Sequence, residues 1–233
     1  MSDARSAILA AIATTQARRH AGPRADGVAI AAEAAALRGR ADATRPDRLG
    51  GSLDAVLMRR LTSVAIGATT EQVRDIDDLH GAVGRYLAAR GLARRVALQP
   101  HAALQALRWT GIETHYTCAV DEAVAVGLAL GAIAETGSLV FHSGPDAPTL
   151  FGFLPTHHIV AVRADSIWPW LEDYSDSIAG GGQPRNINLI TGPSGTTDIE
   201  GALVRGAHGP GWLHVVLIGT STQDTAPHTI TSP

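Results

Sequence analysis

Residues 186–200 read Asn-Ile-Asn-Leu-Ile-Thr-Gly-Pro-Ser-Gly-Thr-Thr-Asp-Ile-Glu, and this stretch decides the fold that the sequence predicts. Its first part is a short apolar run, which predicts a β-strand over 187–191. The run ends at Gly192-Pro193-Ser194-Gly195, whose residues favour a turn. Thr197 and Glu200 then match the S/T-x-x-E capping box, which predicts the start of a helix. Strand, glycine turn and helix in succession are typical of an α/β sheet.

The rest of the chain repeats this alternation from about Ser63 onward. Short apolar runs predict strands near 63–67, 95–98, 112–116, 131–134, 157–163, 187–191 and 213–218. Helical patterns between them predict helices near 75–90, 100–108, 120–127, 147–153, 166–176 and 197–205. Strands that alternate with helices form mainly parallel sheets. The predicted architecture is a three-layer α/β/α sandwich with helices on both faces of the sheet.

The first fifty residues differ in composition from this body. Residues 2–19 and the alanine-rich stretch 28–40 predict two helices that bury little area and need a partner surface. The stretch 41–48 is polar and is interpreted as a linker, after which Ser52 caps a helix with apolar residues at helical spacing. We therefore divide the chain into an N-terminal helical extension (1–50), an α/β domain (51–220) and a C-terminal tail (221–233).

Composition excludes several classes of function. The chain has 233 residues, 45% of them hydrophobic, a formal charge of −3 and a pI near 6.3, with scattered arginines. This gives no electrostatic footprint for nucleic acid or an anionic membrane. The single cysteine, Cys118, excludes an internal disulfide and an iron–sulfur cluster held by the chain's own thiolates. The start resembles no signal peptide and no apolar run reaches membrane-span length, so we expect a cytoplasmic protein.

Two turns are the candidate functional sites. Open α/β sheets bind ligands at the carboxyl ends of their parallel strands. The loop 192–197 follows one predicted strand, and the turn Ala134-Glu135-Thr136-Gly137-Ser138 separates two apolar runs as a tight reversal. We expect both turns at this same edge of the sheet.

The loop 192–197 has two interpretations. It is an anion or carboxylate site at a helix N-terminus, or a turn that only starts a helix. Asp198 and Glu200 complicate the first, because they already place carboxylates in the first helical turn. The spacing matches neither a P-loop nor a dinucleotide-binding motif. The candidate ligand-binding residues here are Gly192, Ser194, Gly195, Thr196, Thr197 and Asp198.

Two residues are candidates for catalysis. Glu135 is a general base, a nucleophile or a hydrogen-bond acceptor, or else a solvated surface carboxylate. His208, in Gly206-Ala207-His208-Gly209-Pro210, is aimed by its flanking glycines or caps the helix predicted before it. The neighbours of Glu135 are ligand-binding candidates: Thr136, Gly137 and Ser138.

The remaining histidines favour structural roles. His157 and His158 are adjacent in a predicted strand and must point to opposite faces, so they cannot share one metal ion without distortion. No metal-ligand spacing accompanies them, and we expect no metal site. His214 lies in an apolar strand and is interpreted as a satisfied core histidine, and Cys118 as a small core residue.

Four motifs together resemble a known family. They are Ile-Ala-Glu-Thr-Gly-Ser-Leu-Val at 133–140, Leu154-Pro155 with His158-Ile159, Gly-Pro-Ser-Gly-Thr-Thr-Asp-Ile-Glu at 192–200, and Gly-Ala-His-Gly-Pro at 206–210. In order and spacing they resemble the LUD domain family, and more narrowly its lactate-utilisation protein C group. The resemblance covers roughly residues 60–220.

This resemblance implies a NagB/RpiA/CoA-transferase-like sheet and a cytoplasmic system that oxidises L-lactate to pyruvate. In that system the C protein acts beside two iron–sulfur partners, so the clusters are expected in the partner subunits and none in this chain. Where the family has an arginine or lysine after Gly-Pro-Ser, this chain has Gly195, which removes a cation that would pair with an anionic ligand.

Two functions follow. The first is a non-redox subunit of a lactate oxidation complex, which binds its partners and contributes substrate-binding groups at Glu135, Ser194 and His208. The second is a stand-alone enzyme of the isomerase, CoA-transferase or cyclo-ligase kind, with a phosphorylated or acyl ligand. In this alternative Glu135 is the nucleophile or base and the Gly-Pro-Ser-Gly amides hold an oxyanion or phosphate.

Overall fold

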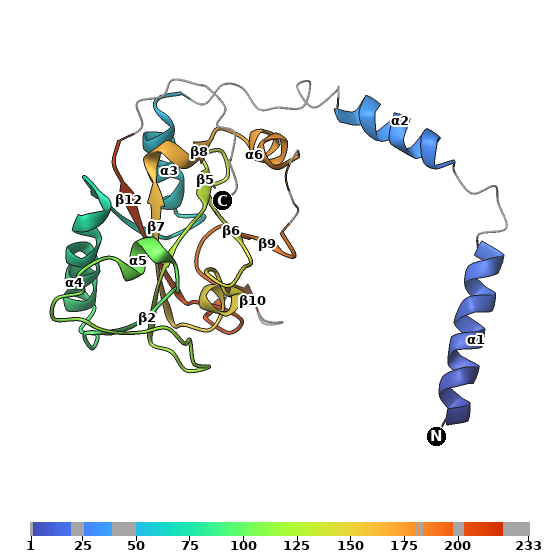
Figure 1. The fold of residues 1–233 in the computed structure, drawn as a ribbon, viewed down its shortest axis with the longest axis horizontal. Coiled ribbons are helices and arrows are strands. Elements are labelled where there is room, and N and C mark those ends of the chain that lie inside the picture. The colour runs from blue at the N-terminus through green and yellow to red at the C-terminus, as the bar shows by residue number, and fades with distance from the viewer. Residues whose placement is uncertain are drawn as a thin grey trace. The chain divides into compact units, whose positions relative to one another are not determined.

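The computed structural model describes residues 2–19, 26–38, 50–179, 181, 184–197 and 203–220. The chain divides into two compact units, Met1–Pro46 and Asp47–Pro233. The first unit contains helices α1 (Ser2–Arg19) and α2 (Gly27–Arg38), which confirms the two predicted N-terminal helices (Figure 1). The proposed C-terminal tail, 221–233, lies outside the described residues.

A six-stranded parallel sheet forms the centre of the second unit (Figure 1). Its order is β1-β12-β7-β4-β2-β3, and every neighbouring pair is parallel. This confirms the α/β class with a mainly parallel sheet. The strands are β1 (Thr69–Val73), β2 (Arg95–Leu98), β3 (Glu113–His115), β4 (Val124–Leu128), β7 (His157–Arg163) and β12 (Trp212–Ile218).

The order of these strands contains a topological switch point. From β2 the chain moves outward to the edge strand β3 and then returns to form β4 on the other side of β2. The connection that leaves β2 therefore runs to one side, towards β3, and the connection that leaves β4 runs to the other side, towards β7. In open α/β sheets, such a reversal leaves a crevice at the carboxyl ends of the two strands.

Two smaller sheets complete the second unit. The first has the order β8-β5-β6-β9, formed by β5 (Gly131–Ile133), β6 (Ser138–His142), β8 (Ile167–Trp168) and β9 (Ile187–Ile190). The second is an antiparallel pair of β10 (Gly195–Thr197) and β11 (Leu203–Arg205). The predicted strands at 131–134 and 187–191 thus exist, but they belong to the small mixed sheet.

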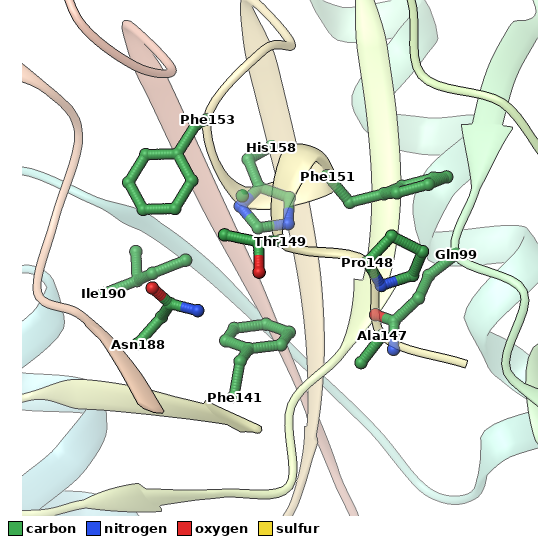
Figure 2. Close-up of a pocket in the computed structure, with 11 residues that line it drawn as sticks. Gln99, Phe141, Ala147, Pro148, Thr149, Phe151, Phe153, His158, Asn188 and Ile190 are labelled. Carbon is green, nitrogen blue, oxygen red and sulfur yellow. The ribbon is translucent and has the colours of Figure 1, made fainter. Parts of the chain in front are cut away.

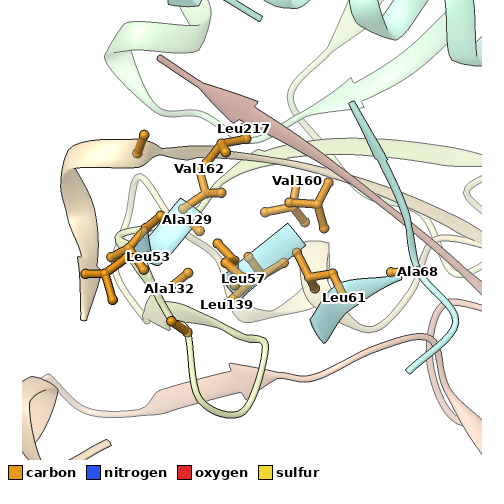
Figure 3. Close-up of a cluster of buried hydrophobic side chains, with 14 of the residues drawn as sticks. Leu53, Leu57, Leu61, Ala68, Ala129, Ala132, Leu139, Val160, Val162 and Leu217 are labelled. Carbon is orange, nitrogen blue, oxygen red and sulfur yellow. The ribbon is translucent and has the colours of Figure 1, made fainter. Parts of the chain in front are cut away.

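Apolar side chains hold these layers together. One face of the parallel sheet packs against α4 (Leu79–Ala89) and α5 (Ala102–Gln105), with η2 (Ile76–Asp78) beside them. The opposite face packs against α3 (Leu53–Leu61) and the small mixed sheet; Figure 3 shows Leu57 and Leu139 facing Val160 and Val162 of β7. Helix α6 (Leu171–Ile178) packs on the mixed sheet through Tyr174.

Several predicted elements were wrong. Residues 63–67 form turns, and the strand begins at Thr69. The predicted helix at 120–127 is strand β4, whose residues are buried from Val124 to Gly127; a strand buried on both faces shows no alternation and cannot be told from a buried helix by pattern. Three predicted helices are shorter than expected. The helix predicted at 100–108 is α5, the one at 147–153 is the short η3 (Thr149–Gly152), and the one at 166–176 is α6, which follows η4 (Ala164–Ser166) and β8.

The predicted helix at 197–205 was also wrong. Residues 195–197 form β10, which pairs in antiparallel register with 203–205, Thr196 opposite Val204. These β-branched residues favour a strand over a helix. Glu200, the second half of the predicted capping box, lies outside the described residues, as does Asp198.

Candidate functional site

The loop at 192–197 lies at the amino edge of the parallel sheet. The Ser194 amide donates a hydrogen bond of 2.7 Å to the Pro210 carbonyl, two residues before β12 begins. On its other side Gly192 adjoins the backbone of Ile66, which precedes β1. The expectation that this loop faces the carboxyl edge was therefore wrong. Without a helix at 197, the loop also lacks the macrodipole on which the predicted anion site depended.

The turn at 134–138 lies beside this loop, as expected. The hydroxyls of Ser138 and Thr191 are 2.6 Å apart, and those of Thr136 and Ser138 are 2.7 Å apart. Gly137 has a φ of +73° and packs closely against Arg60 and Ile66. Both turns therefore share the amino edge. Sequence correctly predicted that both turns face one edge of the sheet, but it chose the wrong edge.

The two catalytic candidates lie in this same region of the chain. Glu135 is partly buried, and its backbone amide donates to the Pro169 carbonyl at 3.1 Å. His208 is exposed in the turn between β11 and β12, so it follows a strand rather than the predicted helix. The nearby Gly206 amide donates to the Ser194 carbonyl at 3.0 Å, which joins this turn to the 192–197 loop.

At the opposite edge, Gln99 occupies the switch point between β2 and β4. It directly follows β2 and is only 2% exposed. Its backbone amide donates to Val126, and its side-chain Oε1 accepts from the Leu128 amide at 2.9 Å. Its Nε2 donates to the Asp146 carbonyl at 3.0 Å. One buried amide thus fixes the diverging ends of two strands and the loop that covers them.

An inner pocket opens beside Gln99, between the parallel sheet and the mixed sheet (Figure 2). Its cavity volume is about 20 Å³, so the pocket is small. Most of its wall is apolar with a few polar groups, as is usual for small-molecule sites. Its lining residues are Gln99, Phe141, Ala147, Pro148, Thr149, Phe151, Gly152, Phe153, His158, Asn188 and Ile190.

His158 lies in the centre of this pocket wall in Figure 2. It is 1% exposed, and neither ring nitrogen has a hydrogen-bond partner within the part of the chain that the structure describes. Burial lowers the pKa of His158 to about 4, so the ring is neutral at pH 7. A neutral imidazole offers one donor and one acceptor.

Gly127 allows this close packing. A Cβ atom at this position would lie 2.8 Å from Gln99 Oε1 and 3.3 Å from His158 Nε2. Any side chain on this residue of β4 would therefore displace one of the two polar groups. The pocket wall depends on a glycine in the middle of a buried strand, where glycine often marks a close approach.

An outer cleft adjoins the inner pocket and shares Gln99, Phe141 and Ala147 with it. It has a volume of about 370 Å³ and lies at the carboxyl ends of β2, β4 and β7. Unlike the inner pocket, it has charged lining residues, Asp146 and Arg163. Arg163 is paired with Asp165 at 3.3 Å on the surface. His101 and His142 also line this cleft.

His157 points to the other face of the sheet, as predicted for adjacent strand residues. Its Nδ1 is hydrogen-bonded to the Tyr86 hydroxyl at 2.9 Å, beneath α4. His214 lies on this same face, with Nδ1 2.9 Å from the Thr69 hydroxyl. Burial lowers the pKa of His214 to about 4. It was predicted to be satisfied, but its Nε2 has no partner among the described residues.

Two further properties concern metals and membranes. Within the described residues, no group of three or more His, Cys, Asp or Glu side chains is arranged to hold a metal ion. None of the helices in the described part of the chain has the length and apolar character needed to cross a membrane. Cys118 is partly buried, and burial raises the pKa of its thiol to about 11.

Comparison with known proteins identifies the family. The family model described as "LUD domain" matches residues 87–218, which is more than half of the chain and includes the whole switch point. The chain belongs to the LUD domain family. A crystal structure of a DUF162 family protein from Deinococcus radiodurans has the same fold, with a TM-score of 0.55, 23% identity, and coverage of 72% of this chain and 96% of that one.

The LUD domain chain is also similar to curated proteins. It is 43% identical over 83 residues to lactate utilization protein C of Bacillus subtilis (strain 168), which covers 34% of this chain and 35% of that protein. Over 186 residues it is 26% identical to lactate utilization protein C of Exiguobacterium sp. (strain ATCC BAA-1283 / AT1b). This match covers 73% of this chain and 81% of that protein. In the first of these matches the chain spans about a third of the relative's length.

The sequence missed most of the residues of the inner pocket and the outer cleft. His158 was weighed as a metal ligand and quoted in a family motif without a role in binding, and Gln99 was not singled out. A signal existed for Gln99: a polar residue followed by Pro100 directly after an apolar run marks the end of a buried strand. Asn188 lay inside the quoted stretch 186–200 and was read only as part of a strand.

Proposed function

We propose that this LUD domain protein is a subunit of a cytoplasmic system that oxidises L-lactate to pyruvate together with iron–sulfur partner proteins. The observation that carries the proposal is its similarity to several proteins named lactate utilization protein C. The longest of these matches extends over 73% of the chain.

The chemistry of the chain supports a division of labour with such partners. Oxidation of lactate to pyruvate removes two electrons and two protons from the substrate. Cysteine-held iron–sulfur clusters that accept electrons usually need four thiolates, and this chain has only Cys118. The raised pKa of that thiol keeps it protonated at neutral pH. We therefore assign the transfer of electrons to partner subunits, and the binding of substrate or partners to this chain.

Two regions of the chain are available for that binding. The outer cleft at the carboxyl edge, next to Gln99, has the position and the lining of a small-molecule site, and the inner pocket with His158 adjoins it. The amino-edge turns carry Glu135, Ser194 and His208, together with the other described residues that were predicted from sequence. We assign the substrate to the carboxyl-edge cleft and keep the amino-edge turns as the second candidate for ligand or partner contact.

One observation favours the alternative function. A cleft at a topological switch point is where stand-alone α/β enzymes bind their substrates, so an isomerase, CoA-transferase or cyclo-ligase activity also fits the fold. The lining of the inner pocket argues against a buried phosphate, because it includes no Lys or Arg side chain.

The test is reconstitution. The chain is purified alone and together with the proteins encoded by neighbouring genes, and lactate-dependent reduction of a dye is measured for each. We expect the mixture to oxidise lactate and the isolated chain to be inactive. Turnover of a sugar phosphate or an acyl-CoA by the isolated chain, lost in Glu135→Gln, would instead establish the stand-alone enzyme.

A further inference from the structure

The strongest unexplained feature of the molecule is the pair of unsatisfied nitrogens on His158. Buried polar groups in native proteins are almost always hydrogen-bonded, and leaving one unpaired costs about 1–3 kcal/mol. His158 has two such atoms on one ring, and both are without a partner among the described residues. A protein retains an energetic cost of this kind where the unpaired group has a function, such as binding a ligand.

The other buried histidines do not share this property. His157 is bonded to Tyr86, and His214 is bonded to Thr69 through one of its nitrogens. Neither of them lines the inner pocket or the outer cleft. Only for His158 do two independent observations coincide: a fully buried ring without partners, and a pocket into which that ring is directed (Figure 2).

The lining of the pocket limits what it can bind. Thr149 and Asn188 line the same pocket as His158 and supply a hydroxyl and an amide, while aromatic rings enclose the remainder (Figure 2). Since no charged side chain lines this space, burying an ionised group here would be costly. The ligand group next to the imidazole is therefore polar and uncharged. A hydroxyl, which is both donor and acceptor, matches a neutral imidazole.

A charged group of the same ligand belongs in the outer cleft. This space adjoins the inner pocket across Gln99 and Phe141, and Arg163 lines it. Arg163 is more than half exposed and is paired with Asp165 at the surface. A carboxylate in the outer cleft keeps access to water, which avoids the cost of burying its charge.

We propose that the inner pocket binds the hydroxyl group of a small 2-hydroxy acid against His158, with the carboxylate of that acid directed to the outer cleft. Asn188 is a second hydrogen-bonding group for the ligand. The inference deepens the proposed function and rests on it for the choice of L-lactate as the probe. It assigns the substrate to residues that the family motifs do not contain, apart from His158 itself.

Histidine NMR signals test this directly in the full chain. The protein is labelled with ¹³C at the imidazole Cε1, and the His158 signal is identified by its loss in His158→Leu. Titration with L-lactate at neutral pH should shift this signal saturably. Propionate, which lacks only the hydroxyl, should bind about tenfold more weakly, the value of one hydrogen bond.

Matched variants on one strand provide the control. Asn188→Ala should weaken lactate binding about tenfold, whereas Leu189→Ala, on the opposite face of β9, should leave it unchanged. Circular dichroism and thermal unfolding confirm that each variant is folded. Equal shifts with propionate and lactate, or an unchanged His158 signal at tens of millimolar lactate, would overturn the assignment.

The same materials separate this proposal from the proposed function. If the reconstituted mixture oxidises lactate while the His158 signal does not respond, the pocket assignment fails and the lactate role stands. If lactate binds at His158 but the mixture does not oxidise it, the pocket assignment stands and the oxidation role fails.

Discussion

At the scale of single residues, His157 and His158 form a natural comparison, because they are neighbours in β7 with opposite surroundings. His157 satisfies the buried Tyr86 hydroxyl, whereas His158 has no partner among the described residues. We predict that His157→Leu lowers the free energy of unfolding by about 1–3 kcal/mol, since it leaves the Tyr86 hydroxyl unpaired. His158→Leu removes two unsatisfied atoms and should raise it by about 1 kcal/mol.

Urea unfolding at neutral pH measures both changes. The opposite signs are the informative result, because the two neighbouring buried histidines differ in whether their ring nitrogens are hydrogen-bonded. A similar loss in the two variants would show that the His158 ring is structural. A stabilised variant that no longer binds lactate would show the usual trade between stability and function at a site.

The low pKa of His158 also predicts how stability changes with pH. The ordinary value is 6.5, and burial lowers it to about 4. Between these values the unfolded chain binds a proton that the folded chain does not, so stability is complete above about pH 6.5 and falls as the pH decreases towards 4. From neutral pH to about pH 5 the expected loss from this residue is about 2 kcal/mol.

Urea unfolding at the two pH values gives the measurement, with His158→Leu as the comparison. The variant should lose less stability on acidification than the parent by about that amount. His214 has a similarly low pKa from burial and remains in both proteins, so part of the acid sensitivity should persist. Parallel curves for the parent and the variant would contradict the burial of a neutral His158.

At the scale of elements, sequence succeeded where one pattern dominated. The strand at 157–163 and the helix within 75–90 were predicted correctly, because the first is a long apolar run and the second has clear helical spacing. Strand β4 was mistaken for a helix because its burial on both faces removes the alternation of strands. For 197–205, a local capping motif was outweighed by strand pairing between residues 195–197 and 203–205.

Contact between β5 and β8 gives a prediction at this scale. A Cβ atom at Gly131 would overlap the Ser166 carbonyl and the Trp168 ring, and backbone atoms cannot move aside as a flexible side chain can. Gly131→Ala should therefore lower the free energy of unfolding by about 1–3 kcal/mol.

Gly81→Ala is the matched control for this change. Gly81 lies in helix α4, and its Cβ atom would meet only the end of the Arg85 side chain, at 3.3 Å. Because alanine favours a helix over glycine by about 0.5–1 kcal/mol, this variant should be neutral or stabilised. Thermal unfolding distinguishes the two, and equal effects would mean that β5 and β8 do not pack as described.

At the scale of the whole molecule, the fold was predictable but the position of the site was not. Alternating apolar runs and helices specified a parallel sheet, and the rule for carboxyl edges was the correct one to apply. The order of strands decides which loops lie at that edge, and this order depends on long-range pairing that no local pattern contains. As a result, the loop at 192–197 was wrongly assigned to the carboxyl edge, where Gln99 lies instead.

The inner pocket and the amino-edge turns lead to the last prediction. In the reconstituted lactate assay, we expect His158→Leu and Asn188→Ala in the inner pocket to raise the KM for lactate about tenfold or more, since each removes a hydrogen bond that we propose to the substrate. Ser194→Ala and His208→Ala at the amino edge should leave that KM unchanged. If these two variants instead abolish activity while substrate binding persists, the amino-edge turns are the catalytic or partner-binding surface. Because Ser194 and His208 belong to turns linked through Pro210 and Gly206, a partner-binding role would also lower the affinity between subunits, which co-purification measures independently of KM.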